Sequence, residues 1–330
     1  MPKLSIIIPC YNAANYIDCC FQSLEHQTIG IKHLEIIFVN DASTDNTQEL
    51  LMDFEKKYPD NVIVINCEQN GRQGAARNIG LRYATAEYVG FADDDDMFAP
   101  EMFEDLYQKA VTYQCDMVMC DFDTVNVDDC RDVKLSPHPS ADDKKSDALY
   151  EIATPEERIA FITADPVRCI WNKIYRRSIL ASNDIRFPEG YIYDDIYFYE
   201  LVKHYVRRVY KRNRIYYHHI FRAKSASIDR DRKDDMLGYL DVQLMLVEEL
   251  KHRGIYNTHR ESYDEMLMLE AIGLIKTYLI RYGEVEYDVL LAIKEKLLPY
   301  REAFLTNTLL QRIWQADDLD IDKRIAQTLL

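Results

Sequence analysis

The chain has 330 residues, 48% of them hydrophobic, and a formal net charge of −16 at pH 7. This length allows two domains, or one large domain with an appendage, and the apolar content is ample for a core. An acidic surface repels phosphate backbones, which excludes nucleic-acid binding as a main function, although a metal ion could still hold a phosphate-bearing small substrate.

Residues 1–125 alternate apolar runs with helical patterns. Strands are predicted at Leu4–Pro9, Leu34–Asn40, Val62–Asn66, Tyr88–Ala92 and Met117–Asp121, and helices at Ala14–Gln27, Asp45–Lys57, Gly74–Ala84 and Pro100–Tyr113. Ser43, Thr44 and Asp45 offer N-cap chemistry to the second helix, and Pro100 suits the first turn of the fourth. Several strands are apolar almost throughout, so the alternation predicts a doubly wound α/β sheet covered on both faces.

The later part of the chain changes character. Residues 128–150 are charged and contain proline, which predicts a mobile surface loop or a short insertion. Arg212–His219 has a strand pattern. The runs Met236–Arg253, Tyr263–Tyr282 and Val285–Tyr300 carry apolar residues at three- and four-residue spacing, which predicts a helical C-terminal appendage. Its methionines, Met266 and Met268, are typical of a core or an oligomer interface, and homo-oligomerisation through these helices stays open.

The sequence also bears on cellular location. It begins at once with an apolar strand pattern, and no apolar run approaches the roughly 20 residues of a membrane helix. Cys10, Cys67 and Cys120 lie in or beside apolar runs and no CxxC pair is present, which predicts reduced, buried thiols. We therefore expect a cytoplasmic protein. The basic stretch 207–214 leaves contact with the membrane surface open, although such a stretch is more often a solvated connection.

Ligands of doubly wound sheets bind at the carboxyl ends of the strands. The segments that follow the predicted strands are 10–12, 40–43, 70–72 and 93–96, and all are polar or charged. In the last, the acidic run of FADDDD (Phe91–Asp96) crowds carboxylates whose repulsion a hard divalent cation would relieve. A solvated acidic loop is the alternative.

Two further segments could contribute to this site. Asp41 follows a strand directly and could accept hydrogen bonds from a base or ribose, or serve only a helix cap. In Asn70–Gly80, glycines allow close backbone approach, and Arg72 and Arg77 bring positive charge toward a diphosphate. The segment is neither a P-loop nor a GxGxxG fingerprint, and an isolated arginine on a helix is usually a surface or ion-pair residue.

Together these segments resemble a known family. SIIIPCYNAANYI, VNDASTDNT, CEQNGRQGAARN and FADDDD, in this order and spacing, resemble a family 2 glycosyltransferase with the GT-A fold, of the bacterial polysaccharide-building type. WNKIYRRSIL (171–180) and FPEGYIYDDIYF (187–198) resemble, more weakly, the acceptor half of such enzymes. The resemblance implies a GT-A domain over 1–228, with a nucleotide-binding half 1–100 and an acceptor half 101–228, followed by a helical region 229–330.

The resemblance also implies roles for particular residues in the donor site. Pro9 and Tyr11 match the segment that cradles uracil, with Asp41 bonding the base, and Arg77 matches an arginine near the donor phosphates or sugar. The Asp-x-Asp motif falls on Asp93, Asp94 and Asp95, with Asp93 near the ribose and donor sugar and Asp95 holding Mn²⁺ or Mg²⁺.

Further implied roles lie later in the chain. Asp194-Asp195 stands where the family has Glu-Asp, which makes Asp195 the candidate base and places Asp194 on the acceptor or donor sugar. Arg222 and Ser225 match phosphate contacts. His218 and His219 replace aromatic residues, and each could be a metal ligand or a packed strand residue.

The expected activity is the metal-assisted, inverting transfer of a sugar, with UDP-sugar as the family's donor, to a sugar, glycan or lipid-linked glycan. Two other classes stay open. A nucleotidyltransferase would carry a Gly-rich loop after its first strand, where this chain has Pro-Cys-Tyr-Asn at 9–12. A non-catalytic protein that binds nucleotides or glycans would not need both the metal carboxylates and the candidate base.

Overall fold

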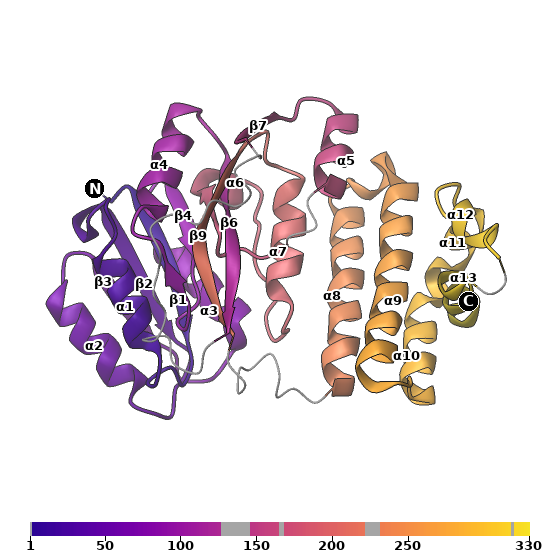
Figure 1. The fold of residues 1–330 in the computed structure, drawn as a ribbon, viewed down its shortest axis with the longest axis horizontal. Coiled ribbons are helices and arrows are strands. Elements are labelled where there is room, and N and C mark those ends of the chain that lie inside the picture. Colours follow the sequence, from indigo (N-terminus) through magenta and orange to yellow (C-terminus); the bar gives the residue numbers. More distant parts are fainter. Residues whose placement is uncertain (1, 127–145, 165–167, 222–231, 318–319) are drawn as a thin grey trace. The chain divides into compact units, whose positions relative to one another are not determined.

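The computed structural model describes residues 2–126, 146–164, 168–221, 232–317 and 320–330. The chain divides into two units, Met1–Asp229 and Arg230–Leu330. Unit 1 contains the sheet and its helices, and unit 2 is helical (Figure 1).

The described residues of unit 1 form a mixed sheet of nine strands in the order β3-β2-β1-β4-β8-β6-β9-β5, with β7 paired to β9. The strands are β1 (Leu4–Cys10), β2 (Leu34–Asn40), β3 (Val62–Asn66), β4 (Tyr88–Phe91), β5 (Met97–Phe98), β6 (Met117–Asn126), β7 (Ala148–Glu151), β8 (Lys173–Arg176) and β9 (Arg208–Phe221). β1 pairs in parallel with β2 and β4, and β2 with β3, whereas β8 is antiparallel to β4 and β6. The predicted α/β class with a mixed sheet and C-terminal helices is confirmed.

Helices cover both faces of this sheet (Figure 1). They are α1 (Ile17–Glu25), α2 (Thr47–Lys57), α3 (Arg72–Tyr83), α4 (Met102–Thr112), α5 (Pro155–Ala164), α6 (Arg177–Ser182) and α7 (Asp194–Lys203). Every residue of β1 and β2 is buried, as near-continuous apolar strands require. Ile6 and Ile8 of β1 belong to a core cluster with residues of α1, α2 and α4, whereas Ile7 faces Gly80 of α3. Because successive side chains of β1 point to opposite faces of the sheet, α1, α2 and α4 pack with Ile6 and Ile8 on one face and α3 packs against Ile7 on the other.

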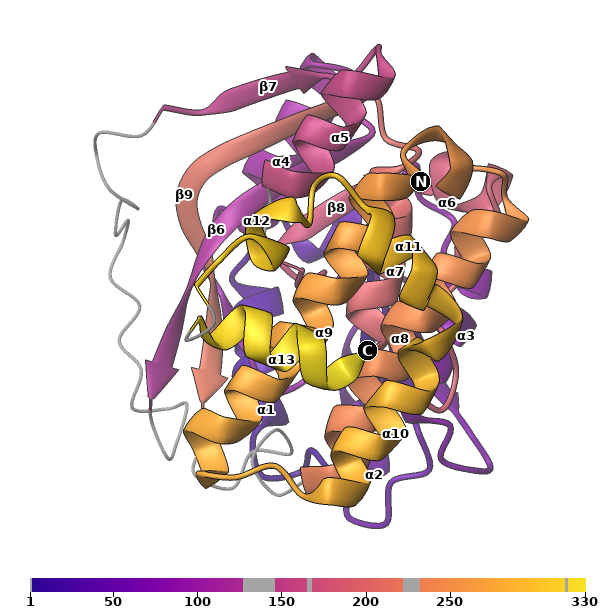
Figure 2. The same ribbon diagram turned by 90° about the vertical axis from the view of Figure 1, so that its right-hand side faces the viewer.

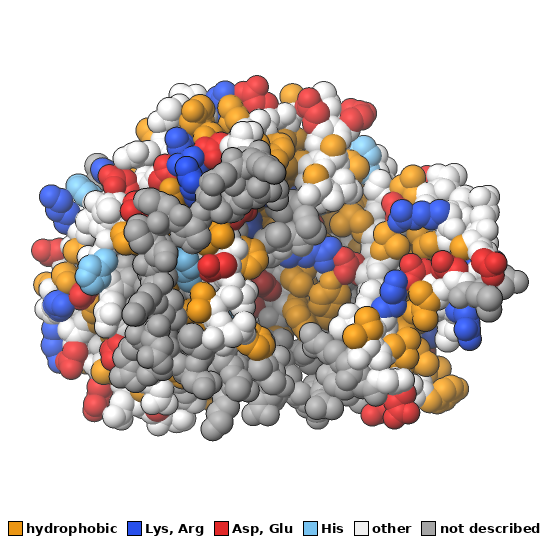
Figure 3. Space-filling model, in the orientation of Figure 1, with side chains coloured by type: hydrophobic (Ala, Val, Ile, Leu, Met, Phe, Trp, Pro, Cys, Tyr) orange, Lys and Arg blue, Asp and Glu red, His pale blue; other side chains and the backbone are white. Residues whose placement is uncertain are grey.

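Unit 2 consists of α8 (Arg232–His252), α9 (Arg260–Tyr282), α10 (Tyr287–Leu297), α11 (Arg301–Thr306), α12 (Gln311–Trp314) and α13 (Ile321–Leu329), with short 3₁₀ turns at Tyr256–Thr258 (η3) and Leu298–Tyr300 (η4) (Figure 2). Met268 of α9 is fully buried, so it belongs to the core of this unit, and Met266 is partly buried. Among the described residues no helix combines the length and apolarity needed to cross a membrane. On the face in Figure 3, acidic and basic side chains are intermixed.

Several expectations about single segments are wrong. Pro100 precedes the N-cap of α4, Glu101, instead of lying in the first turn. The end of the expected loop 128–150 forms β7, although 127–145 lie outside the described residues. The helices after Tyr300 fall within the expected helical region 229–330, but no bounds were predicted for them. Six described cysteines are free thiols, four of them buried, but Cys19 is disulfide-bonded.

Candidate functional site

Left-handed backbone positions lie in the loops after β1 and β2 and at the first residue of α3, which follows β3. Asn12, Ala42 and Arg72 have φ values of 53°, 58° and 67°, a region that residues other than glycine adopt rarely. Asn12 Oδ1 accepts a hydrogen bond from the Thr44 amide at 2.8 Å, and the Asn12 amide donates to Ser43 Oγ at 3.0 Å. Such strain persists where surrounding contacts hold it, often at ligand sites, so this edge of the sheet is a candidate site.

The residues matched to base binding lie at neighbouring strand ends. Pro9 lies within β1, and Tyr11 follows it with a side chain that is 51% exposed. Asp41 follows β2 and is buried, and its Oδ1 accepts from the Gly71 amide at 2.8 Å. Burial raises the pKa of Asp41. The topology thus brings an exposed ring and a buried carboxylate to one edge.

The acidic run, Asp93–Asp96, joins β4 to β5. Asp94 Oδ2 accepts from the Tyr11 amide at 3.3 Å, which ties the run to the end of β1. Burial, followed by the charges of Asp95 and Asp93, raises the pKa of Asp94 well above its usual range. The run therefore contains carboxylate repulsion that the described protein groups do not fully relieve.

Asp96, the last residue of the run, has a different environment. Its side chain is fully buried, and it accepts hydrogen bonds from Tyr217 Oη and the Ile220 amide, both at 2.8 Å. Tyr217 Oη also accepts from the Asp93 amide at 3.1 Å. Asp96 therefore fastens the acidic run to β9.

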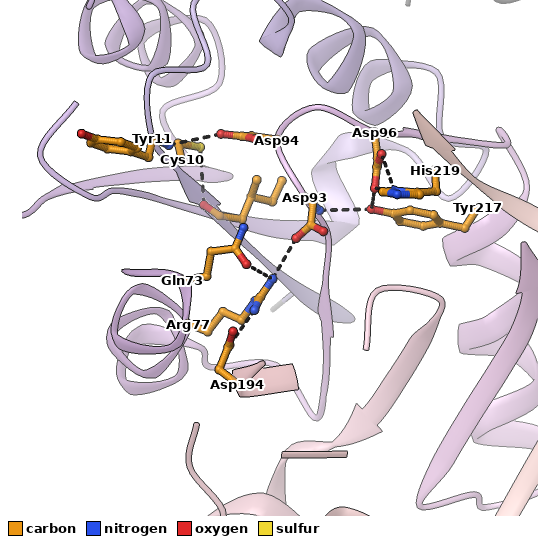
Figure 4. A network of polar contacts seen from close by, with 11 residues as sticks. Cys10, Tyr11, Gln73, Arg77, Asp93, Asp94, Asp96, Asp194, Tyr217 and His219 are labelled. Carbon is orange, nitrogen blue, oxygen red and sulfur yellow. Dashed lines mark hydrogen bonds and ion pairs between the residues drawn. The ribbon is translucent and has the colours of Figure 1, made fainter. Parts of the chain in front are cut away.

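Arg77 of α3 joins the acidic run to α7 (Figure 4). Its guanidinium donates to Asp93 Oδ1 at 2.9 Å and to Asp194 Oδ2 at 2.6 Å. The Arg77 and Asp194 side chains are only 3% and 1% exposed. Among the described residues, Arg77 Nε and Asp194 Oδ1 are buried without a hydrogen-bond partner. Two orphaned polar atoms in a buried cluster are costly unless a ligand completes them.

Two neighbours of Arg77 explain how α3 approaches α7. A Cβ at Gly74 would lie 2.3 Å from the Pro188 carbonyl oxygen and 3.1 Å from Asp194 Cβ, so only glycine fits there. Asn78 accepts from the Phe187 amide and donates to the Phe187 carbonyl, both at 2.9 Å. The segment before α7 is thereby fixed against α3.

Asp195 is the second residue of α7, directly after Asp194. Burial, followed by the Asp194 charge, raises the pKa of Asp195 to about 7, against the opposing effect of Arg77. A carboxylate with a pKa near neutrality can accept a proton at physiological pH, as a general base must. The geometry therefore places a group suited to proton transfer beside the Arg77 cluster.

Both histidines of β9 contact carboxylates. His218 Nδ1 lies 2.7 Å from Asp123 Oδ1 and is buried, which fits the packed strand residue. His219 Nδ1 lies 3.2 Å from Asp96 Oδ1, and its ring stacks on Trp171. Asp96 is already held by Tyr217 and a backbone amide, so His219 completes the anchor of β9.

Not every residue singled out in the sequence joins this cluster. Arg72 is the exposed first residue of α3. Arg222 and Ser225 lie outside the described residues. Asp96 was expected only as a member of the acidic run, and Asn78 and Tyr217 were missed as site-forming residues. The first two lie within the quoted motifs, but nothing local in the sequence distinguishes them from their neighbours.

A divalent cation fits the acidic run only with help from a substrate. Among the described residues, no three His, Cys, Asp or Glu side chains form a ready-made metal site. Mg²⁺ at nucleotide sites commonly takes one or two carboxylates and completes its shell with phosphate oxygens and water. Asp93 and Asp95 can supply such oxygens. Burial, and after it the charges of Asp95 and Asp93, raises the pKa of Asp94, and a cation would stabilise the ionised form of these carboxylates.

Similarities to solved structures extend over almost the whole chain. The structure of Staphylococcus aureus TarS 1–349 in complex with UDP-GlcNAc covers 99% of this chain and 91% of its own, with a TM-score of 0.72 at 21% identity. The mannosyltransferase PcManGT from Pyrobaculum calidifontis, in complex with GDP-Man and Mn²⁺, covers 96% of this chain and 88% of its own, with a TM-score of 0.53 at 17% identity. At these identities the similarity shows the fold.

Sequence comparison identifies the family. The uncharacterized glycosyltransferase YibD of Escherichia coli is 33% identical over 195 residues, which cover 59% of this chain and 54% of that protein. The chain spans about half the length of the first curated relatives it matches. Residues 5–183 match the family described as glycosyl transferase family 2. The match includes the strand ends, Arg77 and the acidic run, and the chain belongs to glycosyl transferase family 2.

Proposed function

We propose that the chain transfers a sugar from a nucleotide diphosphate donor, a UDP-sugar, to a hydroxyl of a sugar, glycan or lipid-linked glycan, with inversion at the anomeric carbon. The observation that carries this proposal is the bridge from Asp93 through Arg77 to Asp194. It joins a carboxylate suited to a metal to the start of α7, where the next residue, Asp195, is suited to proton transfer, and both functions are needed for displacement at an anomeric carbon.

The donor would lie along the strand ends. The exposed ring of Tyr11 and the carboxylate of Asp41 are placed to stack on and bond a base, with Pro9 shaping the loop. The bound UDP-GlcNAc of TarS supports a uridine donor. Asp95 and Asp93 would hold Mn²⁺ or Mg²⁺, which when bound stabilises the charge on the leaving diphosphate. The Mn²⁺ complex of PcManGT supports this metal class.

Arg77 takes a role different from a phosphate contact. Its guanidinium is already engaged by two carboxylates and is 3% exposed. We therefore propose that Arg77 fixes the positions of Asp93 and Asp194 relative to each other. Contacts with the diphosphate are then proposed for Arg72, Arg222 and Ser225. A sugar hydroxyl, which both donates and accepts, would satisfy the orphaned Asp194 Oδ1.

Asp195 would remove the proton from the attacking hydroxyl. Its pKa of about 7 leaves a large fraction ionised at neutral pH while keeping it basic enough to accept a proton. Arg77 and Asp194 fix the start of α7 and so orient Asp195. Inversion follows because a single base and a single displacement leave no covalent intermediate.

The test is calorimetric binding of nucleoside diphosphates to the full chain with and without Mn²⁺. We expect UDP to bind best with Mn²⁺, and Asp95→Asn to weaken that binding by about 10- to 100-fold, the size of effect seen when metal-supporting groups are changed. Asp53→Asn, an exposed carboxylate of α2, is the control and should change binding less than about twofold. If UDP affinity were the same with and without Mn²⁺ and were unchanged in Asp95→Asn, the proposed donor site would be refuted.

A further inference from the structure

Unit 2 contains a hollow of about 590 Å³ between the end of α8, η3, the start of α9 and the α10–α11 connection. Every residue that lines it belongs to this unit, so it is separate from the candidate site of unit 1. Its volume lies within the range of roughly 300–1,000 Å³ that small-molecule pockets occupy. The residues relevant to ligand chemistry are Glu248, Lys251, Asn257, Arg260, Lys296 and Tyr300.

The charge that faces this hollow is opposite to that of the chain. Among the described residues that line it, Lys251, Arg260 and Lys296 face a single carboxylate, Glu248, in a chain whose net charge is −16. Arg260 Nε lies 3.6 Å from Asp264 Oδ2, and Lys296 Nζ lies 2.5 Å from Asp241 Oδ1.

Neither of those two aspartates lines the hollow. Asp264 and Asp241 therefore pair with Arg260 and Lys296 without lining the hollow, and so fix the positions of these two cations. The two aspartates offset part of the positive charge, but the hollow is still lined by guanidinium and ammonium groups, whose charged N–H donors are the groups that bind phosphate.

The carboxylate that lines the hollow, Glu248, further restricts which ligands could bind there. Glu248 Oε1 accepts from Lys251 Nζ at 2.8 Å and from Tyr300 Oη at 2.7 Å. These hydrogen bonds lower the pKa of Glu248, so it stays ionised at neutral pH. An ionised carboxylate repels a bare anion but accepts hydrogen bonds from hydroxyl groups. A ligand that suits both the cations and Glu248 therefore carries a phosphate and hydroxyl groups in one molecule.

We propose that this hollow binds a phosphorylated sugar or polyol, with the phosphate on Arg260 and Lys296 and the hydroxyls on Glu248 and Asn257. This site goes beyond the proposed transfer reaction and does not depend on it. The same chemistry could come from a free phosphorylated metabolite or from one unit of a phosphodiester-linked polymer.

The test measures binding of glycerol 3-phosphate to the full chain by calorimetry in EDTA, with glycerol and inorganic phosphate as separate probes. Arg260→Gln and Lys296→Gln should each weaken binding about tenfold, because each removes a charge-assisted contact. Arg312→Gln and Lys276→Gln are matched controls in the same unit. The Arg312 side chain is 65% exposed against 62% for Arg260, and Lys276 is 40% exposed against 33% for Lys296.

Three outcomes would overturn the proposal: no saturable binding, equal losses in the lining and control variants, or inorganic phosphate binding as tightly as glycerol 3-phosphate. UDP binding with Mn²⁺ is measured on every variant and should stay unchanged, which separates failure of this site from failure of the donor site. A glycerol phosphate trimer that binds more tightly than the monomer would identify a polymer segment. Equal binding of monomer and trimer would identify a free metabolite.

Discussion

The acidic run, Asp93–Asp96, and the Asp194–Asp195 pair are two carboxylate-rich segments. Within each segment, the protein stabilises the charge of one carboxylate more than that of its neighbour. In the run, burial raises the pKa of both Asp96 and Asp94. Hydrogen bonds from His219 and the Ile220 amide oppose this rise at Asp96, whereas the pKa of Asp94, which accepts from the Tyr11 amide, lies well above its usual range. In the pair, burial raises the pKa of both carboxyls, but Arg77 opposes the rise at Asp194 through a direct hydrogen bond, whereas Asp195 has a pKa of about 7. In each segment, one carboxylate has hydrogen-bond partners that stabilise its ionised form, whereas the ionised form of a neighbour is less stabilised.

The difference indicates which groups await a ligand. A carboxylate matched by protein donors has little to gain from a substrate, whereas a repelled carboxylate gains from a cation or a proton. The acidic run retains repulsion suited to a cation, and Asp195 retains basicity suited to a proton. Perturbed groups of this kind are concentrated at catalytic sites. The predictions that follow test this division.

The largest effect is expected for Asp195→Asn. Removing a general base should lower turnover by about 10²–10⁴ while UDP binding with Mn²⁺ is retained. Steady-state kinetics with a UDP-sugar measures the loss. Asp184→Asn, a carboxylate that is 85% exposed, is the control and should keep full turnover. Turnover unchanged in Asp195→Asn would remove this residue from the base role.

The pH dependence sharpens the same prediction. In the wild type, kcat/KM should rise with pH through about 7, because only the ionised Asp195 accepts a proton. The folded pKa lies above the unfolded value of about 3.9, so the folded state binds this proton more tightly. Wild-type stability should therefore fall as pH rises from about 4 to about 7, and Asp195→Asn should lessen that fall. Urea unfolding at several pH values measures it.

A large loss of stability is expected for Arg77→Leu. The variant leaves Asp194, 1% exposed, and Asp93 without their cation, and breaking a buried ion pair typically costs about 3–5 kcal/mol. Urea denaturation measures the change. Arg82→Leu, an exposed position on the same helix, should stay within about 0.5 kcal/mol. A loss below about 1 kcal/mol in Arg77→Leu would mean that protonation, and not Arg77, neutralises the pair.

Much of the fold could be predicted because local pattern and burial agree. Leu34–Asn40 and Val62–Asn66 are strands with the predicted bounds, and the first of these is buried throughout, as its apolar sequence implies. Ala148–Glu151 was missed because this strand is largely exposed and carries no apolar periodicity. It forms only because β9 offers an edge to pair with.

The candidate site could be predicted in its parts but not in its connections. The strand ends and the acidic run follow from topology, since parallel strands bring their carboxyl ends to one edge. The Arg77–Asp194 contact joins residues 117 positions apart, and the fit of Gly74 against Pro188 depends on the packed chain. No spacing in the sequence encodes either contact. Likewise, only the course of β9 distinguishes Asp96 from the three aspartates before it.

Asp96→Asn tests the division within the acidic run and should have the smallest effect of these substitutions. Asparagine keeps one acceptor for the Ile220 amide but loses the charged acceptor for Tyr217 and His219, which should cost about 1–3 kcal/mol. Thermal and urea unfolding measure the loss. Asp95→Asn is the matched control, and it should leave stability within about 0.5 kcal/mol while weakening UDP binding with Mn²⁺. If Asp96→Asn instead spared stability and abolished that binding, the buried aspartate would be the metal ligand. The acidic run would then not divide into a part that serves the fold and a part that awaits a ligand.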